Sequence, residues 1–151
     1  MFRGNNPINL DAKGRIAIPA RYRDALTLQC QGQLVATIDI QDKCLSIYPL
    51  PEWEKIEQKI SSLPTFNPAT RRVQRLLIGH ARELELDGSG RVLVPPELRS
   101  FAEIDKKTML VGQGRRFELW DLDNWNGQRD SWLEEAANEL SIPDEILHLS
   151  L

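Results

Sequence analysis

The sequence predicts an α+β protein, mostly β, in which two fused copies of one unit form a pseudo-twofold body. The first observation is a repeat: residues 9–19, NLDAKGRIAIP, return as residues 85–95, ELDGSGRVLVP. Each copy has an Asp, an Arg four positions later with Gly directly before it, an apolar triplet and a Pro. Repeated units of this kind bury their apolar faces against one another. We therefore expect the two copies to share a core.

A second match follows downstream of the first. Residues 45–48 followed by Trp53 correspond to residues 117–120 followed by Trp125. The offset between copies is 76 at the first match (87 minus 11) and 72 at the second (117 minus 45), so the second copy has a shorter loop. In a chain of 151 residues, each copy of about 50 to 60 residues would be marginally stable alone. The length therefore favours one compact body.

Each copy is predicted to contain a strand, turn, strand, short helix, strand, turn and strand. Residues 8–10 alternate between apolar and polar, and the triplets 16–18 and 92–94 are β-prone. Asp and Gly between such segments favour a tight reversal, so we expect a short hairpin in each copy. The prolines that follow end the strands and open short helices over residues 19–26 and 95–99. Further strands are expected at residues 34–38, 45–48, 109–111 and 117–120.

Three helices are predicted outside this pattern. Apolar residues recur at helical spacing in residues 51–60 and 121–140. Between them, Asn67 and Pro68 are a favourable N-cap and first position for a helix that runs to about Gly79. The predicted organisation is a first repeat at residues 1–53, a helical linker packed on the body at 54–80, a second repeat at 81–125, and a C-terminal acidic helix and tail at 126–151.

Charge is unevenly distributed along the chain. The sequence has 19 Lys and Arg against 22 Asp and Glu, a net charge of −3. Residues 121–151 hold eight acids and one base, which leaves a net charge of +4 for residues 1–120. This distribution predicts a basic face with an acidic tail, although solvated helix faces and polar loops would also give such clusters. The overall acidity argues against indiscriminate binding of polyanions.

Other function classes have little support in the sequence. No apolar run is long enough to span a membrane and the N-terminus lacks a signal peptide, so we expect a cytoplasmic protein. Cys30 and Cys44 lie far apart and outside any CxxC spacing, and His80 and His148 are the only histidines. We expect reduced thiols, and no metal, cofactor or small-molecule substrate.

The repeated Asp-x-x-x-Arg unit is the candidate functional site. In a functional interpretation, the turns project Lys13 and Arg15, and Arg91 in the second copy, from rigid tips where a guanidinium can contact guanine or phosphate. Asp11 and Asp87 would close the turns and orient the arginines. In a structural interpretation each Asp only pairs with its Arg, a surface ion pair worth under about 1 kcal/mol. Two copies favour function, because a pseudo-twofold pair of basic tips suits duplex DNA.

The two tips are not equivalent. Ser89 stands where the first copy has Lys13, and Glu97 stands where it has Arg21. We therefore expect the first repeat to contact nucleic acid and the second to act mainly through packing, assembly or support.

Two alternatives belong to other classes. Asp11 and Asp87 could meet at the pseudo-twofold axis as the carboxylate dyad of an enzyme. The Arg four residues after each Asp would keep the carboxylate ionised, so we expect no catalytic residues and no enzyme activity. The other alternative is a protein-interaction module, in the manner of an antitoxin, whose acidic tail binds a partner.

Six motifs spread over the whole chain form a specific combination. They are MFRG at the start, NLDAKGR at residues 9–15, YPLPEW at 48–53, RRVQR at 71–75, GHA at 79–81 and DGSGR at 87–91. Together they resemble the MraZ family of bacterial transcriptional regulators, which is associated with the division and cell wall gene cluster.

The resemblance implies a fold and a function. The fold is AbrB-like, a swapped-hairpin, double-psi-type β-barrel also seen in MazE-type antitoxins, with both halves fused in one chain. The function is that of a nucleoid-associated repressor, a ring-shaped homo-oligomer that binds short direct repeats of double-stranded DNA in the promoter of its own operon. The family's DNA-facing residues fall on Arg3, Lys13 and Arg15, with Asp11 in the turn. Asp87 and Arg91 form the second motif.

Overall fold

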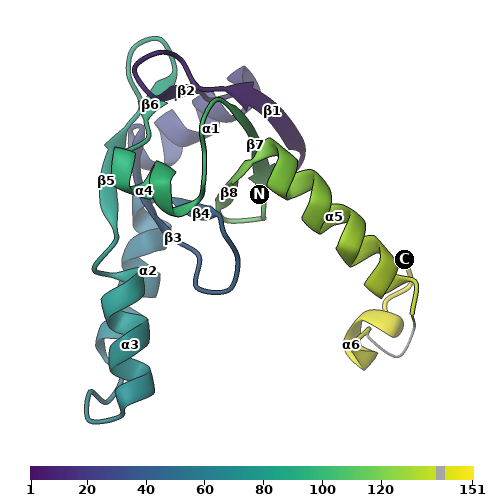
Figure 1. Cartoon of the computed structure of the whole chain (residues 1–151). Helices are drawn as coiled ribbons and strands as arrows, with labels where there is room; N and C mark the ends of the chain where they lie inside the picture. The colour runs from purple at the N-terminus through teal and green to yellow at the C-terminus, as the bar shows by residue number, and fades with distance from the viewer. Residues whose placement is uncertain (139–141) are drawn as a thin grey trace.

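The fold is described from a computed structural model, which covers residues 1–138 and 142–151. Eight strands and six helices follow one another in these residues (Figure 1). They are β1 (Asn5–Asn9), β2 (Arg15–Ala17), α1 (Ala20–Cys30), β3 (Gln33–Ile38), β4 (Leu45–Pro49), α2 (Leu50–Ser61), α3 (Pro68–Leu77), β5 (Arg82–Glu85), β6 (Arg91–Leu93), α4 (Pro96–Phe101), β7 (Lys107–Gly112), β8 (Phe117–Asp121), α5 (Leu122–Ala136) and α6 (Asp144–Leu147). All four further strands predicted from the sequence are present.

The strands form one six-stranded antiparallel sheet, in the order β1-β7-β8-β4-β3-β5, and a separate two-stranded ribbon of β2 and β6. The order is symmetric: if each strand is replaced by its equivalent in the other repeat, the same order is obtained when read from the opposite edge. At the centre of each ladder, equivalent residues face one another: Ser46 pairs with Glu118, and Ile16 pairs with Val92. The α+β class and the pseudo-twofold body, which is mostly antiparallel sheet, are therefore confirmed.

The predicted hairpins are wrong in their pairing. The turns form, with the Asp11 N–H donating to the Arg15 carbonyl at 2.9 Å, but β1 pairs with β7 and β2 pairs with β6. Each turn connects the large sheet to the ribbon, so the two strands that flank it find their partners in the other repeat. This exchange fully buries Ile16 and Val92 between the repeats. In the second repeat β5 pairs with β3 in the same way.

The closed barrel implied by the resemblance is not seen in residues 1–138 and 142–151. The six-stranded sheet begins with β1 and ends with β5, and the ribbon forms a ladder of its own. Because residues 10–14 and 86–90 carry the chain from the sheet to the ribbon, β1 and β5 each remain paired on one side only.

The two repeats share one apolar core. Its aromatic centre is formed by Phe2, Tyr22 and Phe117, with ring centroids 4.2 Å apart for Phe2 and Phe117 and 5.0 Å apart for Tyr22 and Phe117. Cys30 and Cys44 are buried free thiols in different apolar clusters. The expectation that the two copies share a core is therefore confirmed.

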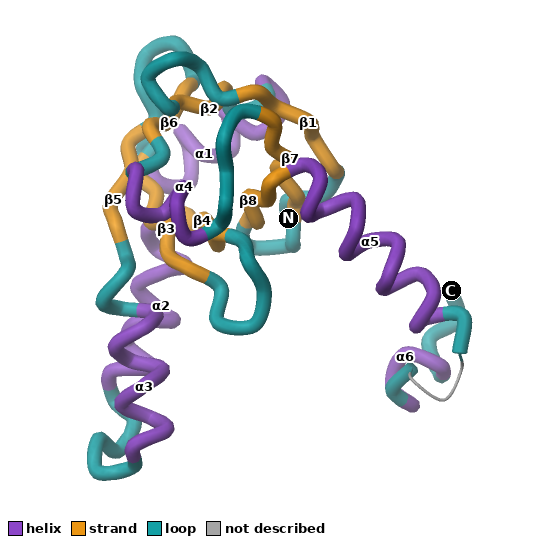
Figure 2. The backbone as a smooth tube through the Cα atoms, in the orientation of Figure 1, coloured by secondary structure: helices purple, strands orange, loops and turns teal. Residues whose placement is uncertain are grey.

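The helices cover the sheet and form two projections from it (Figure 2). The first is the hairpin of α2 and α3, whose predicted N-cap is confirmed: the Asn67 side chain accepts a hydrogen bond from the Ala69 N–H at 2.9 Å. The second is α5, which ends at Ala136, before the predicted end at residue 140; residues 139 and 140 lie outside the described residues. No helix in the described ranges has the length and apolarity needed to cross a bilayer.

Candidate nucleic-acid interface

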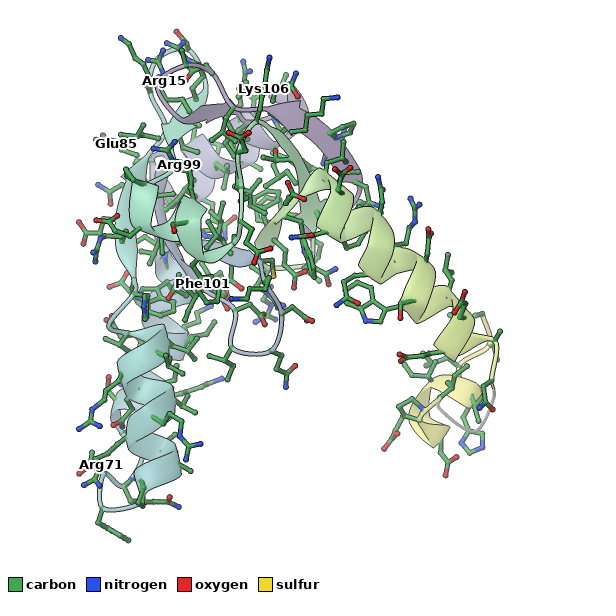
Figure 3. All side chains as sticks on the ribbon, viewed as in Figure 1. Arg15, Arg71, Glu85, Arg99, Phe101 and Lys106 are labelled. Carbon is green, nitrogen blue, oxygen red and sulfur yellow. The ribbon has the colours of Figure 1, made fainter. Side chains whose placement is uncertain are left out.

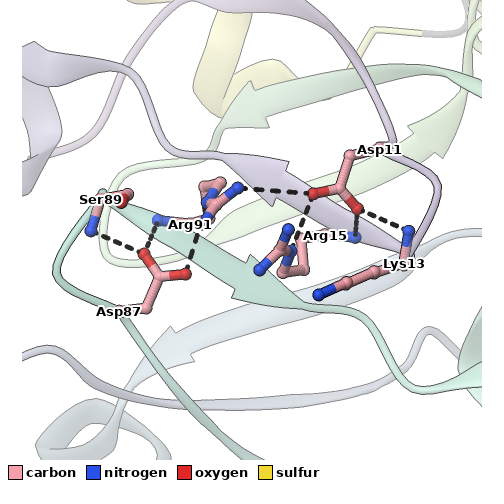
Figure 4. Close-up of polar contacts among 6 residues, drawn as sticks. All are labelled: Asp11, Lys13, Arg15, Asp87, Ser89 and Arg91. Atoms are coloured by element: carbon pink, nitrogen blue, oxygen red, sulfur yellow. Dashed lines mark hydrogen bonds and ion pairs between the residues drawn. The ribbon is translucent and has the colours of Figure 1, made fainter.

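Each repeated Asp organises its turn and its Arg at the same time (Figure 4). Asp11 Oδ1 accepts hydrogen bonds from the backbone N–H groups of Lys13 and Arg15, both at 2.9 Å. Its other oxygen, Oδ2, accepts from Arg15 Nε at 2.8 Å. Asp87 repeats the two backbone contacts with Ser89 and Arg91 at 2.9 Å. The predicted turn-closing and Arg-orienting roles are thus combined in one carboxylate.

The second unit is looser than the first. Arg91 Nε lies 3.4 Å from Asp87 Oδ2 and makes no hydrogen bond, whereas the equivalent Arg15 Nε is hydrogen-bonded. Arg91 also reaches across the pseudo-twofold axis, where its Nη1 lies 3.8 Å from Asp11 Oδ2. Arg91 therefore links the two repeats, while Arg15 is held by its own turn.

The electrostatics of the two carboxylates oppose a catalytic dyad. Backbone hydrogen bonding from Arg15 lowers the pKa of Asp11, although partial desolvation acts in the other direction. Backbone hydrogen bonding from Arg91 lowers the pKa of Asp87 for the same reason. A dyad that shares a proton needs one carboxyl with a raised pKa, because two adjacent carboxylates cannot both ionise freely. Here both are held ionised, each beside a guanidinium.

The ribbon places both arginines on the outward side of the molecule. Ile16 and Val92 point into the core, so their neighbours along each strand point away from it. The side chains of Arg15 and Arg91 are 25% and 35% exposed, and Leu93, which pairs with Arg15, is also exposed. Two partly exposed guanidinium groups therefore lie on one surface, close to the pseudo-twofold axis.

Two further arginines support the turns and were not identified from the sequence as part of this site. Arg23 and Arg99 are equivalent in the repeats, since 99 minus 23 is 76. Arg23 Nε donates to the Ile18 carbonyl at 2.7 Å, and Arg99 Nε donates to the Val94 carbonyl at 3.0 Å. Each guanidinium lies against the turn glycine of the other repeat, a position where a Cβ atom would collide with it. The offset of 76, which they share with Arg15 and Arg91, is the sequence signal that could have identified them.

The backbone also ties each turn to the opposite repeat. The Ile18 N–H donates to the Gly90 carbonyl, and the Val94 N–H donates to the Gly14 carbonyl, both at 2.9 Å. Gly14 and Gly90 have φ angles of +84° and +76°, which side chains rarely adopt. The two tips are therefore joined to each other by backbone hydrogen bonds between the repeats.

The predicted basic residues do not all meet at one place. Lys13 is exposed at the first turn, whereas Arg3 lies before the extended strand β1. At about 3.3 Å per residue, the chain from Arg3 to Asp11 can span up to about 26 Å. Lys106 lies closer to the first turn, because its carbonyl accepts from the Leu10 N–H at 2.8 Å. Figure 3 shows Arg15 and Lys106 at the same end of the molecule, with Arg71 at the opposite end.

The surroundings of the two turns differ in charge. Beside the first turn, Lys107 pairs with Asn9, and Lys106 directly precedes Lys107. Two lysines at the start of β7 therefore lie next to this turn. Beside the second turn, β5 carries Glu83 and Glu85, and the Leu86 N–H donates to the carbonyl of the uncharged Gly32 at 2.8 Å. The first turn is thus the more basic of the two.

One cluster of potential metal ligands lies elsewhere. Ligand atoms of Asp39, Cys44 and Glu118 lie within 4.8 Å of one another. Both carboxylates already have partners: Asp39 accepts two backbone N–H groups of its own loop at 2.8 Å, and Glu118 pairs with Arg116 at 3.0 Å. Burial raises the pKa of the Cys44 thiol, which disfavours the thiolate that a metal would bind. These contacts indicate a structural role for the cluster.

Comparison with known proteins identifies the family. The family model described as "MraZ protein, putative antitoxin-like" matches residues 1–76 and 77–142, one segment for each repeat. The chain belongs to the MraZ family.

Relatives in this family match the chain over its whole length. Proteins named "Transcriptional regulator MraZ" from Halorhodospira halophila, Pseudomonas aeruginosa and Coxiella burnetii are 55%, 56% and 56% identical, with 100% of both chains covered in each case. The resemblance noted from the six motifs is therefore confirmed. The relatives' names are those of MraZ regulators, in agreement with the expectation that the chain is not an enzyme.

Proposed function

We propose that this protein is a sequence-specific DNA-binding transcriptional regulator, a repressor, whose basic tips contact double-stranded DNA. The observation that carries this proposal is the pair of Asp–Arg units locked together on the outward face of the β2–β6 ribbon. A pre-organised guanidinium loses little conformational freedom on binding and can fork onto guanine O6 and N7 or onto a phosphate. The regulator names of the relatives support the same function.

The first tip is the principal contact in this proposal. Arg15 Nε donates to Asp11 at 2.8 Å, and the two terminal nitrogens make no hydrogen bond within the described residues, so they can face a ligand. Lys13 and Lys106 would contact phosphates beside it, since lysines act as point charges toward the DNA backbone. Arg91 and Asp87 would support the assembly of the tips, because Arg91 also pairs with Asp11. Arg3, which precedes β1, would contact DNA at a separate place.

The wider biological assignment is also a proposal. We propose a ring-shaped homo-oligomer that binds short direct repeats in the promoter of its own division and cell wall gene cluster, as a cytoplasmic, nucleoid-associated protein. One tip gives weak and salt-sensitive binding, but several subunits on spaced repeats gain effective concentration. The exchange of strand partners after each turn supports an AbrB-like swapped-hairpin relation. We also propose that the chain is organised as a first repeat at residues 1–53, a helical linker at 54–80, a second repeat at 81–125 and a C-terminal helix and tail at 126–151.

A gel shift with single substitutions tests the roles of the two arginines. Arg15→Ala is expected to weaken binding to a duplex with the promoter repeats by at least about fivefold, because a bidentate base contact is worth about 1–3 kcal/mol. Arg91→Ala is expected to have a smaller effect on DNA binding and to lower the melting temperature, since it removes a link between repeats. Arg115→Ala, on an exposed loop, is the matched control.

Two readouts decide the outcome. Circular dichroism should show that Arg15→Ala remains folded. If Arg15→Ala binds the duplex with wild-type affinity, the first tip is not the DNA contact and the proposal fails.

A further inference from the structure

Two helical arms are rooted on the body of the molecule and project from it. The hairpin arm consists of α2, α3 and the residues between them, 50–77. The C-terminal arm consists of α5 and α6, residues 122–138 and 142–151. Figures 1 and 2 show these arms on different sides of the body and pointing apart. Among the described residues, eight of the twelve large apolar side chains that are exposed lie on these arms, so the exposed apolar surface is concentrated there.

The hairpin arm is basic and apolar. No residue of α3 is fully buried, and in the turn before it Phe66 is 84% exposed and Leu63 is 46% exposed. Arg71 and Arg75 lie one helical turn apart on α3, and both are exposed. Residues 60–80 contain three arginines and no acid. Figure 3 places Arg71 at the far end of this arm from the tips.

The C-terminal arm is acidic and apolar. Residues 130–151 contain six acids and neither Lys nor Arg. Leu133 is 62% exposed, and the exposed residues of the last segment include Ile146 and Leu147. The whole stretch 131–138 is exposed although α5 continues to Ala136. Because short helices gain most of their stability from packing, a helix end with exposed apolar side chains is suited to packing against another molecule.

The base of the C-terminal arm fixes its direction. Asp121 caps α5 by accepting the Asn124 N–H at 3.0 Å. Trp125 packs on Trp120 with ring centroids 5.6 Å apart, and Trp132 contacts both rings at 5.7 and 5.9 Å. This anchoring holds the acidic arm away from the hairpin arm of its own chain. Contact between the acidic arm and the basic hairpin arm would therefore need a second copy of the chain.

We propose that the C-terminal arm of one copy docks on the hairpin arm of the next, with acidic side chains beside Arg71 and Arg75 and apolar side chains against Phe66 and Leu63. The two surfaces differ, so the contact is heterologous and joins copies head to tail, as in a ring or a filament. This inference rests on the homo-oligomer part of the proposed function and names the surfaces that form it. It does not depend on DNA binding.

A charge exchange between the arms tests this contact. The hairpin variant is Arg71→Glu with Arg75→Glu, and the tail variant is Glu134→Arg with Asp144→Arg. Sedimentation velocity of the full chain, without DNA, measures the mass of the assembly. Each variant alone should associate at least about tenfold more weakly than the wild type. An equimolar mixture should regain the wild-type mass, because the acidic tail of one variant fits the basic hairpin of the other, and the two reversed surfaces fit each other.

A control variant and three possible outcomes complete the test of the contact between the arms. Lys106→Glu with Arg115→Glu makes the same charge change on the body and should leave the mass unchanged. Regained mass in the mixture also shows that both variants are folded. The inference is wrong if single variants keep the wild-type mass, if the mixture stays dissociated, or if the wild type sediments as one chain of 17.3 kDa.

Parallel DNA measurements separate this inference from the proposed function. Arg15→Ala should lose duplex binding and keep the mass of the assembly. If it binds DNA normally, DNA recognition by the first tip fails while the mass data still decide the contact between arms. If the hairpin variant keeps its mass but loses duplex binding, the basic face of α3 is a nucleic-acid contact and the docking proposal is overturned.

Discussion

At the scale of single residues, the repeated Asp does more than pair with an Arg. Asp11 accepts two backbone N–H groups and one guanidinium N–H, so a single carboxylate fixes both the shape of the turn and the direction of Arg15. This explains why the functional and structural interpretations of the motif are not exclusive. The Asp11–Arg15 ion pair orders the arginine side chain that is proposed to bind DNA. A surface ion pair adds little to the free energy of unfolding, but it can still orient this side chain.

The lowered pKa values of Asp11 and Asp87 predict an acid dependence of stability. A carboxyl whose folded-state pKa lies below its unfolded value contributes stability above the ordinary pKa of 3.8, and this stability is lost as the pH falls through the lower folded value. Asp11→Asn with Asp87→Asn keeps oxygen acceptors for the backbone but removes the ionisation. The free energy of unfolding in urea, measured from pH 6 to pH 2.5, should therefore fall less steeply in the variant. Parallel curves for the two proteins would contradict the assignment.

At the scale of elements, the turns, the ribbon and the helices after them form one cross-linked unit. α1 and α4 each supply an arginine that packs on the turn glycine of the other repeat. The residue after each ribbon strand donates a backbone hydrogen bond to that same turn. Each tip is therefore held by contacts from both repeats.

Two glycines of the second turn provide a matched test of this unit. At Gly90, a Cβ atom would lie 2.3 Å from Arg23 Nε, and the φ angle of +76° disfavours a side chain. Gly90→Ala should destabilise the protein by at least about 1–2 kcal/mol. Gly88 has open space around it, so Gly88→Ala should be within about 0.5 kcal/mol of the wild type. Thermal melts of both variants measure the difference; equal melting temperatures would exclude the proposed packing of Arg23.

The elements could be predicted from the sequence, but their pairing could not. Strand and helix positions depend on local periodicity and on Pro and Asn signals, which explains the agreement for α2 and for the N-cap at Asn67. Strand alternation does not specify a partner, so the expected local hairpins were wrong. Arg99 was missed because it contacts the turn at Gly14, far away in sequence. The resemblance places Arg3 on the same DNA-facing surface as Lys13 and Arg15, and the structure places β1 between Arg3 and the first turn.

At the scale of the whole molecule, opposite ends have different chemistry. The basic tips occupy one end, while the basic hairpin arm and the acidic C-terminal arm project elsewhere (Figures 1 and 3). The net charge of −3 therefore hides two basic surfaces. In the proposed assembly the acidic arm of a neighbour neutralises the hairpin arm, and the tips remain free for a polyanion. Because binding would come from several tips at once, it should be strongly salt-dependent.

The most direct test of the central claim is site-specific photocrosslinking of the full chain to a duplex that carries the promoter repeats. A photoreactive side chain is placed in turn at Lys13, Ser89 and Arg72, which lie on the first tip, the second tip and the hairpin arm. We predict strong DNA crosslinks from position 13, weaker ones from position 89 and none above background from position 72. Crosslinks from position 72 without any from position 13 would contradict DNA recognition by the tips.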